Sequence, residues 1–181
     1  MDKSAFLKSL EDNVDIIRDE YVRQIGQVHM TTLPGWDKDG NYTAIPTPGW
    51  RTAVMWWDGR PRLTMQRKFP ITTELVRHGP NHRATAFLNL EAHSETDYHR
   101  HPSDWGDKWV AHLPLFIPDG DVGFLVEDQI HRWQEGRLFV FESSSWHQGF
   151  NRTNHPRVML ALGFDDSWSE AVRPYTHFNT V

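Results

Sequence analysis

Histidines are the residues of this chain with the clearest capacity for chemistry. The 181 residues include 11 histidines and no cysteine, so any metal site would use nitrogen and oxygen ligands rather than thiolates. Three short segments concentrate the histidines, at residues 98–101, 110–113 and 145–148. Imidazole is both a ligand for transition metals and a general base. The sequence therefore predicts that a functional site, if it uses histidine, is formed by these three segments.

Two histidines are the best candidates for metal ligands because of their positions relative to the predicted strands and to an arginine. A single histidine in a β-rich domain is more often a core or surface residue than a metal ligand. His101 and His147, however, flank the same set of apolar strands, and Arg157 opens the next strand. His112 lies within a strongly apolar strand, where an imidazole needs a partner. A guanidinium that points into a barrel needs a carboxylate or a bound anion.

The elements that must position these residues are mainly strands. Short apolar runs bounded by glycine, proline and aspartate turns follow one another along the second half of the chain, with no helices between them. This pattern favours a barrel or sandwich over a parallel α/β sheet. The predicted strands are residues 52–57, 85–90, 110–117, 122–126, 137–141 and 158–164.

The N-terminal segment predicts an amphipathic helix over residues 4–26. Apolar residues recur there at three- and four-residue steps, and Ser4 is the expected N-cap. A second short helix is expected after Pro70, capped by Thr72 or Thr73. We expect one domain over residues 1–181, in which the first helix braces a β-barrel core at about 85–165.

Composition excludes several classes of function. The formal charge is −5 and the pI is near 6.1, which argues against a nucleic-acid partner. No apolar run is long enough to cross a membrane, and the first residues lack the apolar centre of a signal peptide. A chain without cysteine suits a reducing compartment, so we expect a cytoplasmic protein. The oligomeric state is left open.

Several motifs match one known family in their order and spacing. They are found at residues 6–13, 69–73, 112–118 (HLPLFIP) and 133–141 (WQEGRLFVF). With His101, His147 and Arg157 they make the chain resemble the catalytic domain of the aspartyl/asparaginyl β-hydroxylases. That family consists of iron(II)- and 2-oxoglutarate-dependent oxygenases on a double-stranded β-helix, a jelly-roll fold like that of the cupins.

The resemblance implies a role for each of four residues. His101 and His147 fall on the two iron-binding histidines of the family, which are also its catalytic residues. His112 and Arg157 fall on the residues that contact the cosubstrate 2-oxoglutarate, with Arg157 at its distal carboxylate. Iron(II), 2-oxoglutarate and O₂ are thus the expected cofactors and cosubstrates, bound at adjacent positions of one iron centre.

The chain departs from the family pattern at the substrate side of the site. Ser103 replaces the family's glycine two residues after the first ligand, so either water or Asp104 is expected to complete the iron shell. Where the family has two arginines before His112, this chain has Lys108 and Val110. Lys108 retains a positive charge without the guanidinium fork and is a candidate substrate contact. Trp105 is a second candidate at the mouth of the site.

The leading hypothesis is a dioxygenase that hydroxylates an unactivated carbon. The expected substrate is an amino acid, a peptidyl Asp- or Asn-like side chain, or a small biosynthetic intermediate. Two alternatives use the same fold: a cupin-like protein that binds a metal or carboxylate without oxidising anything, and a metal enzyme that works without O₂. Dependence on O₂ and on 2-oxoglutarate distinguishes the three.

Overall fold

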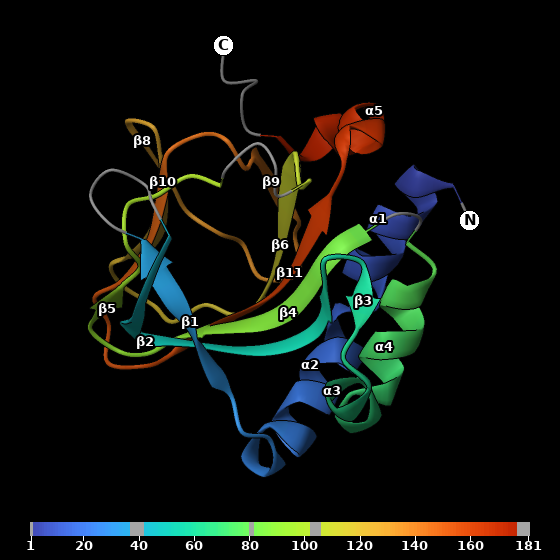
Figure 1. Cartoon of the computed structure of the whole chain (residues 1–181), viewed down its shortest axis with the longest axis horizontal. Helices are drawn as coiled ribbons and strands as arrows, with labels where there is room; N and C mark the ends of the chain where they lie inside the picture. The colour runs from blue at the N-terminus through green and yellow to red at the C-terminus, as the bar shows by residue number, and fades with distance from the viewer. Residues whose placement is uncertain (1, 37–41, 80–81, 102–105, 177–181) are drawn as a thin grey trace.

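The computed structural model describes residues 2–36, 42–79, 82–101 and 106–176. Helices lie mainly in the first half of the chain, and a short one follows the last strand (Figure 1). The α-helices are α1 (Lys3–Asp12), α2 (Val14–Gln24), α3 (Leu63–Lys68), α4 (Pro70–Arg77) and α5 (Ser169–Val172), and the 3₁₀ turns are η1 (Ile25–Gln27), η3 (Asp166–Trp168) and η4 (Arg173–Tyr175).

The strands form two antiparallel sheets that face each other. In the described residues the larger sheet has the order β1-β2-β4-β11-β6-β9, with β3 paired to β2, and the smaller has the order β5-β10-β7-β8. The strands are β1 (Thr31–Trp36), β2 (Tyr42–Trp57), β3 (Arg60–Pro61), β4 (His82–Leu90), β5 (Ser94–Glu95), β6 (Trp109–Phe116), β7 (Val122–Val126), β8 (Gln129–His131), β9 (Phe139–Glu142), β10 (His147–Asn151) and β11 (Arg157–Phe164).

The chain winds back and forth between these sheets. From β4 onward it passes to the smaller sheet at β5, returns at β6, crosses to β7 and β8, returns at β9, crosses to β10 and ends in β11. This winding is the double-stranded β-helix, and the predicted mainly β fold is confirmed. The helices α1, α2 and α4 cover the outer face of the larger sheet (Figure 1).

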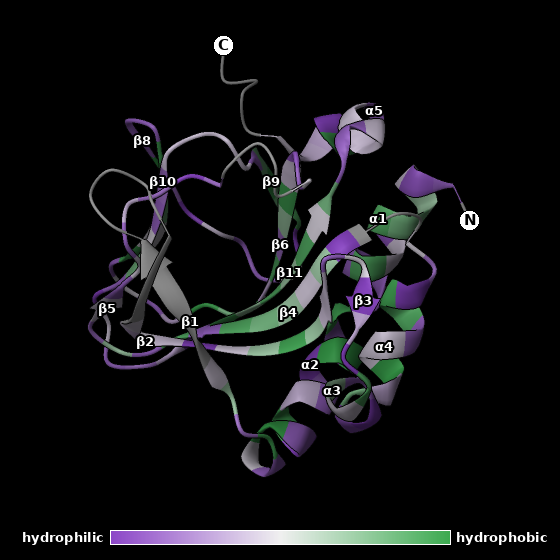
Figure 2. Ribbon diagram, viewed as in Figure 1, coloured by the Kyte–Doolittle hydropathy of each residue, from purple (hydrophilic) through white to green (hydrophobic). Residues whose placement is uncertain are grey.

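Alternation along β11 separates two hydrophobic cores. Leu160 and Phe164 belong to the core between the larger sheet and the helices, where Phe164 stacks on Trp168 with ring centroids 4.2 Å apart. Met159 belongs to the core between the two sheets. Successive side chains of a strand point to opposite faces, so a strand buried on both faces has an unbroken apolar sequence. Bands of hydrophobic and hydrophilic residues also alternate along the helices (Figure 2), and α1, α2 and α4 each bury some of their residues.

The predicted N-terminal helix is two helices. The chain breaks at Asn13, whose side-chain amide donates to the carbonyl of Ser9 at 2.8 Å and ends α1. The predicted N-cap, Ser4, is wrong: Asp2 caps α1 by accepting from the backbone N–H of Ala5 at 2.9 Å. Asparagine competes for backbone hydrogen bonds in this way, and apolar periodicity alone does not reveal the break.

The predicted cap of the second helical segment is also wrong. Neither Thr72 nor Thr73 caps α4, which begins at Pro70. Instead the buried carboxylate of Glu20 accepts from the backbone N–H groups of Ile71 and Thr72, each at 2.7 Å. A carboxylate at a helix N-terminus satisfies N–H groups that have no partner within the helix. Glu20 of α2 thus caps α4 in place of a residue of that helix.

Strand β10 was not among the predicted strands. The prediction placed His147 just past a strand end, whereas His147 begins β10 and pairs with Val126 of β7. Its sequence, HQGFN, is polar and lacks clear alternation, so tertiary pairing rather than pattern holds it in the sheet. The helices of the described residues are at most 11 residues long, and none is long and apolar enough to span a bilayer.

Candidate active site

One open cavity lies between the two sheets. Its volume is about 1000 Å³, including the space at its mouth, and both sheets contribute to its walls. Four buried or half-buried histidines and one arginine line it, together with aromatic and aliphatic side chains. A concave apolar site with a few convergent polar groups is the usual form of a small-molecule site. The histidines are His99, His101, His112 and His147.

Three of these histidines converge on one point. The candidate ligand atoms of His99, His101 and His147 all lie within 4.8 Å of one another. His99 and His147 are held opposite each other by two backbone hydrogen bonds, of 3.0 and 2.7 Å, between their N–H and carbonyl groups. His99 is 3% exposed and His147 4%. Ligands about 2 Å from one ion are at most about 4 Å apart, so the three imidazoles would have to move slightly closer to one another to bind a single metal.

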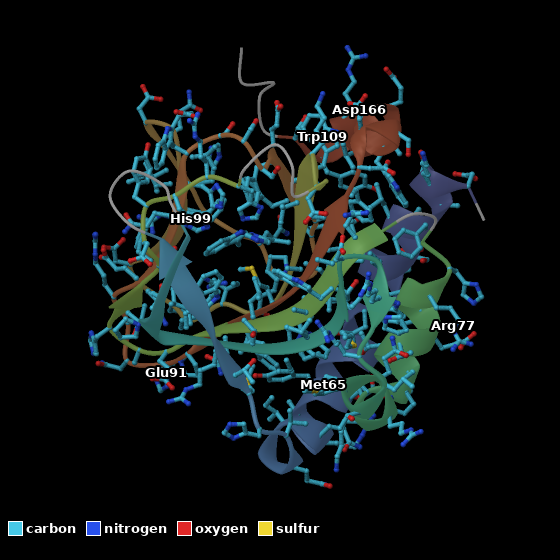
Figure 3. The ribbon with its side chains drawn as sticks, in the orientation of Figure 1. Met65, Arg77, Glu91, His99, Trp109 and Asp166 are labelled. Carbon is cyan, nitrogen blue, oxygen red and sulfur yellow. The ribbon has the colours of Figure 1, made fainter. Side chains whose placement is uncertain are left out.

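Backbone carbonyls fix the orientation of two of the rings. The Nδ1–H of His99 donates to the carbonyl of Asp97 and that of His147 to the carbonyl of Ser145, both at 2.8 Å. With Nδ1 carrying the proton, Nε2 is the ring nitrogen that can bind a metal. Metal-binding histidines characteristically donate their other ring N–H to such an acceptor, which fixes the tautomer. Figure 3 shows His99 on the side of the barrel where β5 and β10 lie.

Burial keeps the three imidazoles uncharged. Burial lowers the pKa of His101 to about 3, and proximity to His99 adds to the effect. The pKa values of His99 and His147 are lowered for the same first reason, burial. Neutral imidazole is the form that binds metal. In the described part of the chain this group consists of imidazoles alone, a donor set that suits iron(II).

Arg157 supplies a buried positive charge to the same cavity. The residue is 3% exposed, and its Nε and Nη1 have no hydrogen-bond partner among the described residues. Burial lowers the pKa of Arg157 to about 9, which still leaves the guanidinium charged at neutral pH. The guanidinium lies 4.8 Å from the ring centre of Trp133. A Cβ on Gly149 would lie 2.9 Å from Nη2, so the glycine makes room for it. A buried cation of this kind favours a bound anion.

His112 lines the same cavity, near enough to Arg157 and His101 for their charges to act on it. It belongs to β6, is 5% exposed, and its ring contacts Phe124 and Phe141 with centroids 5.1 and 5.2 Å apart. Its Nδ1 has no hydrogen-bond partner among the described residues. Burial lowers the pKa of His112 well below 6.5, and the charge of Arg157 lowers it further. A neutral imidazole with an unused polar atom can hydrogen-bond a ligand held by Arg157.

Burial of His112 predicts a pH dependence of stability. Its pKa is lower in the folded protein than in the unfolded chain, so the unfolded chain binds a proton first and stability falls as pH drops below about 6.5. Between about pH 7 and pH 5 this one group should cost about 2 kcal/mol. Urea unfolding of metal-free His112→Gln should therefore show a smaller loss than wild type. The exposed control His29→Gln should keep the wild-type loss, and an unchanged loss in His112→Gln would contradict the prediction.

The structure brings together four of the predicted site residues. His101, His147, His112 and Arg157 line one cavity. Lys108, in contrast, is not among the described residues that line it. Its Nζ lies 2.9 Å from Asp166, and Figure 3 shows Asp166 at the surface near the C-terminal helix. A substrate contact from Lys108 stays a prediction.

Three residues named in the sequence analysis lie outside the described residues. They are Ser103, Asp104 and Trp105. Whether Asp104 reaches the histidine cluster and whether Trp105 contacts substrate stay predictions.

Two titratable residues of the cavity wall, His99 and Asp107, are not singled out by the sequence analysis. His99 precedes His101 by two residues, and this spacing places both side chains on one face of an extended segment; that signal was available. Asp107, a partly buried carboxylate in the cavity wall, follows Gly106 in a segment with no periodic pattern, and nothing in the sequence singles it out.

Comparison with known proteins relates the chain to one family of hydroxylases. The family described as aspartyl/asparaginyl beta-hydroxylase matches residues 11–167. The ornithine lipid ester-linked acyl 2-hydroxylase of Rhizobium tropici is 26% identical over 117 residues, which are 64% of this chain and 41% of that protein. The aspartyl/asparaginyl beta-hydroxylase of Homo sapiens is 22% identical over 174 residues, 94% of this chain and 22% of that protein. The chain thus spans less than half the length of either relative.

A solved structure has a related shape. Rru_A2000 from Rhodospirillum rubrum, a cupin-2 domain, has a TM-score of 0.44 and 10% identity over 74% of this chain and 69% of that chain. The family match covers most of the sequence and includes every residue of the histidine and arginine site. The chain belongs to the aspartyl/asparaginyl β-hydroxylase family.

Proposed function

We propose that this chain is an iron(II)- and 2-oxoglutarate-dependent hydroxylase. One observation supports the proposal above all others: a cluster of three neutral histidines shares a cavity with a buried arginine, whose Nε and Nη1 have no hydrogen-bond partner among the described residues. The cluster suits a metal and the arginine suits a carboxylate. A 2-oxo acid has both a metal-chelating end and a distal carboxylate, so one ligand of this class satisfies both.

Each side chain has a defined task in this proposal. His99, His101 and His147 hold the metal through Nε2 of the fixed rings and through the third imidazole. Arg157 binds the distal carboxylate of 2-oxoglutarate, and His112 hydrogen-bonds the same molecule. When bound, iron(II) with 2-oxoglutarate supplies the activation of O₂ that hydroxylation of an unactivated carbon requires.

The apolar walls contribute by excluding water. Phe124 and Phe141 pack against His112 and His147, with centroids between 4.8 and 5.6 Å. A reactive centre surrounded by aromatic side chains reacts with a bound substrate rather than with solvent. We expect a small-molecule or peptide substrate, no nucleic-acid or membrane partner, and a cytoplasmic location.

Anaerobic binding followed by visible absorption tests the proposal. Iron(II) added to the protein with 2-oxoglutarate should produce the weak metal-to-ligand band of a chelated 2-oxo acid. His147→Ala and Arg157→Met should abolish the band, whereas the exposed control His29→Gln should keep it. Admission of O₂ should then release succinate in the wild type, because such enzymes turn over slowly without their substrate.

Two outcomes would replace the proposal. If iron and 2-oxoglutarate bind without any succinate formation, the chain is a non-oxidising metal- and carboxylate-binding protein. If no band forms although iron binds, the cavity does not take the cosubstrate. Val110, which lines the cavity where the resembled family has arginine, then explains the loss, and a metal enzyme independent of O₂ becomes the better candidate.

A further inference from the structure

A carboxylate lies in the cavity wall and no part of the proposed chemistry uses it. Asp107 precedes β6, and its Oδ1 is buried without a hydrogen-bond partner among the described residues. Among the described residues that line the cavity, only Asp107 and Arg157 have side chains that are charged in their usual state. Arg157 is assigned to the cosubstrate. The carboxylate is therefore available to recognise something else.

Asp107 and Arg157 lie at opposite ends of β11. A Cβ on Gly163 would lie 2.5 Å from Oδ2 of Asp107, so the carboxylate lies directly against Gly163. Arg157 and Gly163 stand at opposite ends of β11, about 20 Å apart along the strand. His112 pairs with Ala161 and lies between them. A cosubstrate anchored at Arg157 thus leaves the Asp107 end of the cavity for the substrate.

The walls at the Asp107 end are apolar. Val54, Ala84 and Val110 line it, and both Ala84 and Val110 pair with Gly163. The indole rings of Trp56 and Trp57 add aromatic surface to the same cavity. Small residues beside large aromatic ones leave space for an apolar body, and burial of that body drives binding.

Asp107 forms no ion pair with a described residue, although the charge of Arg83 acts on it. Arg83 is the nearest candidate, but its guanidinium forms a short ion pair with Asp58. Burial raises the pKa of Asp107 to about 7; the attraction of Arg83 opposes this shift and the repulsion of Asp58 adds to it. A carboxyl group in this position gains from any ligand that brings a positive charge and N–H donors.

We propose that the substrate is an apolar molecule bearing a primary ammonium group, and that Asp107 binds this group. The inference rests on the proposed function, because it assigns the Arg157 end to 2-oxoglutarate. The chemistry is that of an amine attached to an aromatic or aliphatic body. A carboxylate head group in the same position would meet Asp107 with a charge of the same sign.

Calorimetric titration with matched probes tests the proposal. Phenethylamine and 2-phenylethanol share an apolar body and differ in the group offered to Asp107, and 3-phenylpropionate offers an anion. We expect the iron- and 2-oxoglutarate-loaded wild type to bind the amine at least roughly tenfold more tightly than the alcohol. Asp107→Asn keeps the shape of the side chain and should lose this preference. Asp119→Asn, an exposed aspartate, should keep it.

The absorption band distinguishes failure of the substrate inference from failure of the proposed function. If the band forms in wild type and Asp107→Asn alike and neither prefers the amine, the substrate inference is overturned and the proposed function stands. If the band is absent but the wild type prefers the amine and Asp107→Asn does not, the proposed function fails and Asp107 remains an amine-binding residue. A preference for the anion would also overturn the inference. Loss of the band in Asp107→Asn would show a structural role for the residue instead.

Discussion

Replacing Arg157 with methionine should weaken binding of 2-oxoglutarate at least roughly 100-fold, and should also stabilise the protein when no ligand is present. Charge-assisted hydrogen bonds contribute about 1.5–3 kcal/mol each, and two of them from one guanidinium account for the loss of affinity. Without ligand, Nε and Nη1 are buried and unpartnered among the described residues. Methionine removes that uncompensated charge and fills a similar volume, which favours the folded state by about 1–3 kcal/mol.

Thermal unfolding with and without 2-oxoglutarate measures both effects at once. Wild type should gain stability from the ligand, whereas Arg157→Met should begin at a higher melting temperature and gain nothing. Arg152→Met is the matched control, since Arg152 is exposed and forms ion pairs with Glu95 and Asp121; it should bind the ligand normally. A melting temperature that rises with 2-oxoglutarate in Arg157→Met would place the cosubstrate elsewhere.

Removing any one of the three clustered histidines should lower iron(II) affinity by at least about 100-fold. Loss of a second-sphere contact already costs 10- to 100-fold, and loss of a ligand removes a bond to the metal itself. For His101 and His147 this result is expected from two-histidine and three-histidine sites alike. The His99 variant distinguishes a two-histidine site from a three-histidine site. We expect His99 to be a ligand because its ring is oriented as firmly as that of His147.

Anaerobic titration of iron(II) into His99→Ala, His101→Ala and His147→Ala gives the measurement. His93→Ala is the matched control, because His93 is exposed and contacts Asn154 at 2.9 Å. Equal losses in the three variants indicate a site of three imidazoles. Iron affinity within about threefold of wild type in His99→Ala would instead reduce the site to His101 and His147, as the sequence analysis predicted.

The strongly patterned strands explain why much of the site was predictable. β6 and β11 are buried on both faces, so their sequences are nearly unbroken apolar runs in which His112 and Arg157 are conspicuous. A polar residue in such a run has to be explained by a partner. The β-barrel class follows from the same runs, because they recur at short spacing without helices between them.

The rest of the site depends on contacts distant in sequence. The two-residue spacing of His99 and His101 is visible in the sequence, but the pairing of His99 with His147 of β10, which brings the third imidazole to the same point, is not. Asp107 becomes a cavity residue because β11 brings Gly163 beside it. The Glu20 cap of α4 likewise joins residues about fifty positions apart. Local pattern does not encode such pairs, so the structure was needed to find them.

The clustering of His101 and His147 has a consequence for the lifetime of the fold. The chain has no cysteine, but a metal held by His101 and His147 would close the long loop of chain between these two residues, as a disulfide does. The same metal would link the segment that contains His101 to β10. Unlike a disulfide, this link opens when a chelator removes the ion. Amide protons of β10 should therefore exchange with solvent slowly in the metal-bound protein and quickly after chelation, and proteases should cut the stripped protein first between β9 and β10.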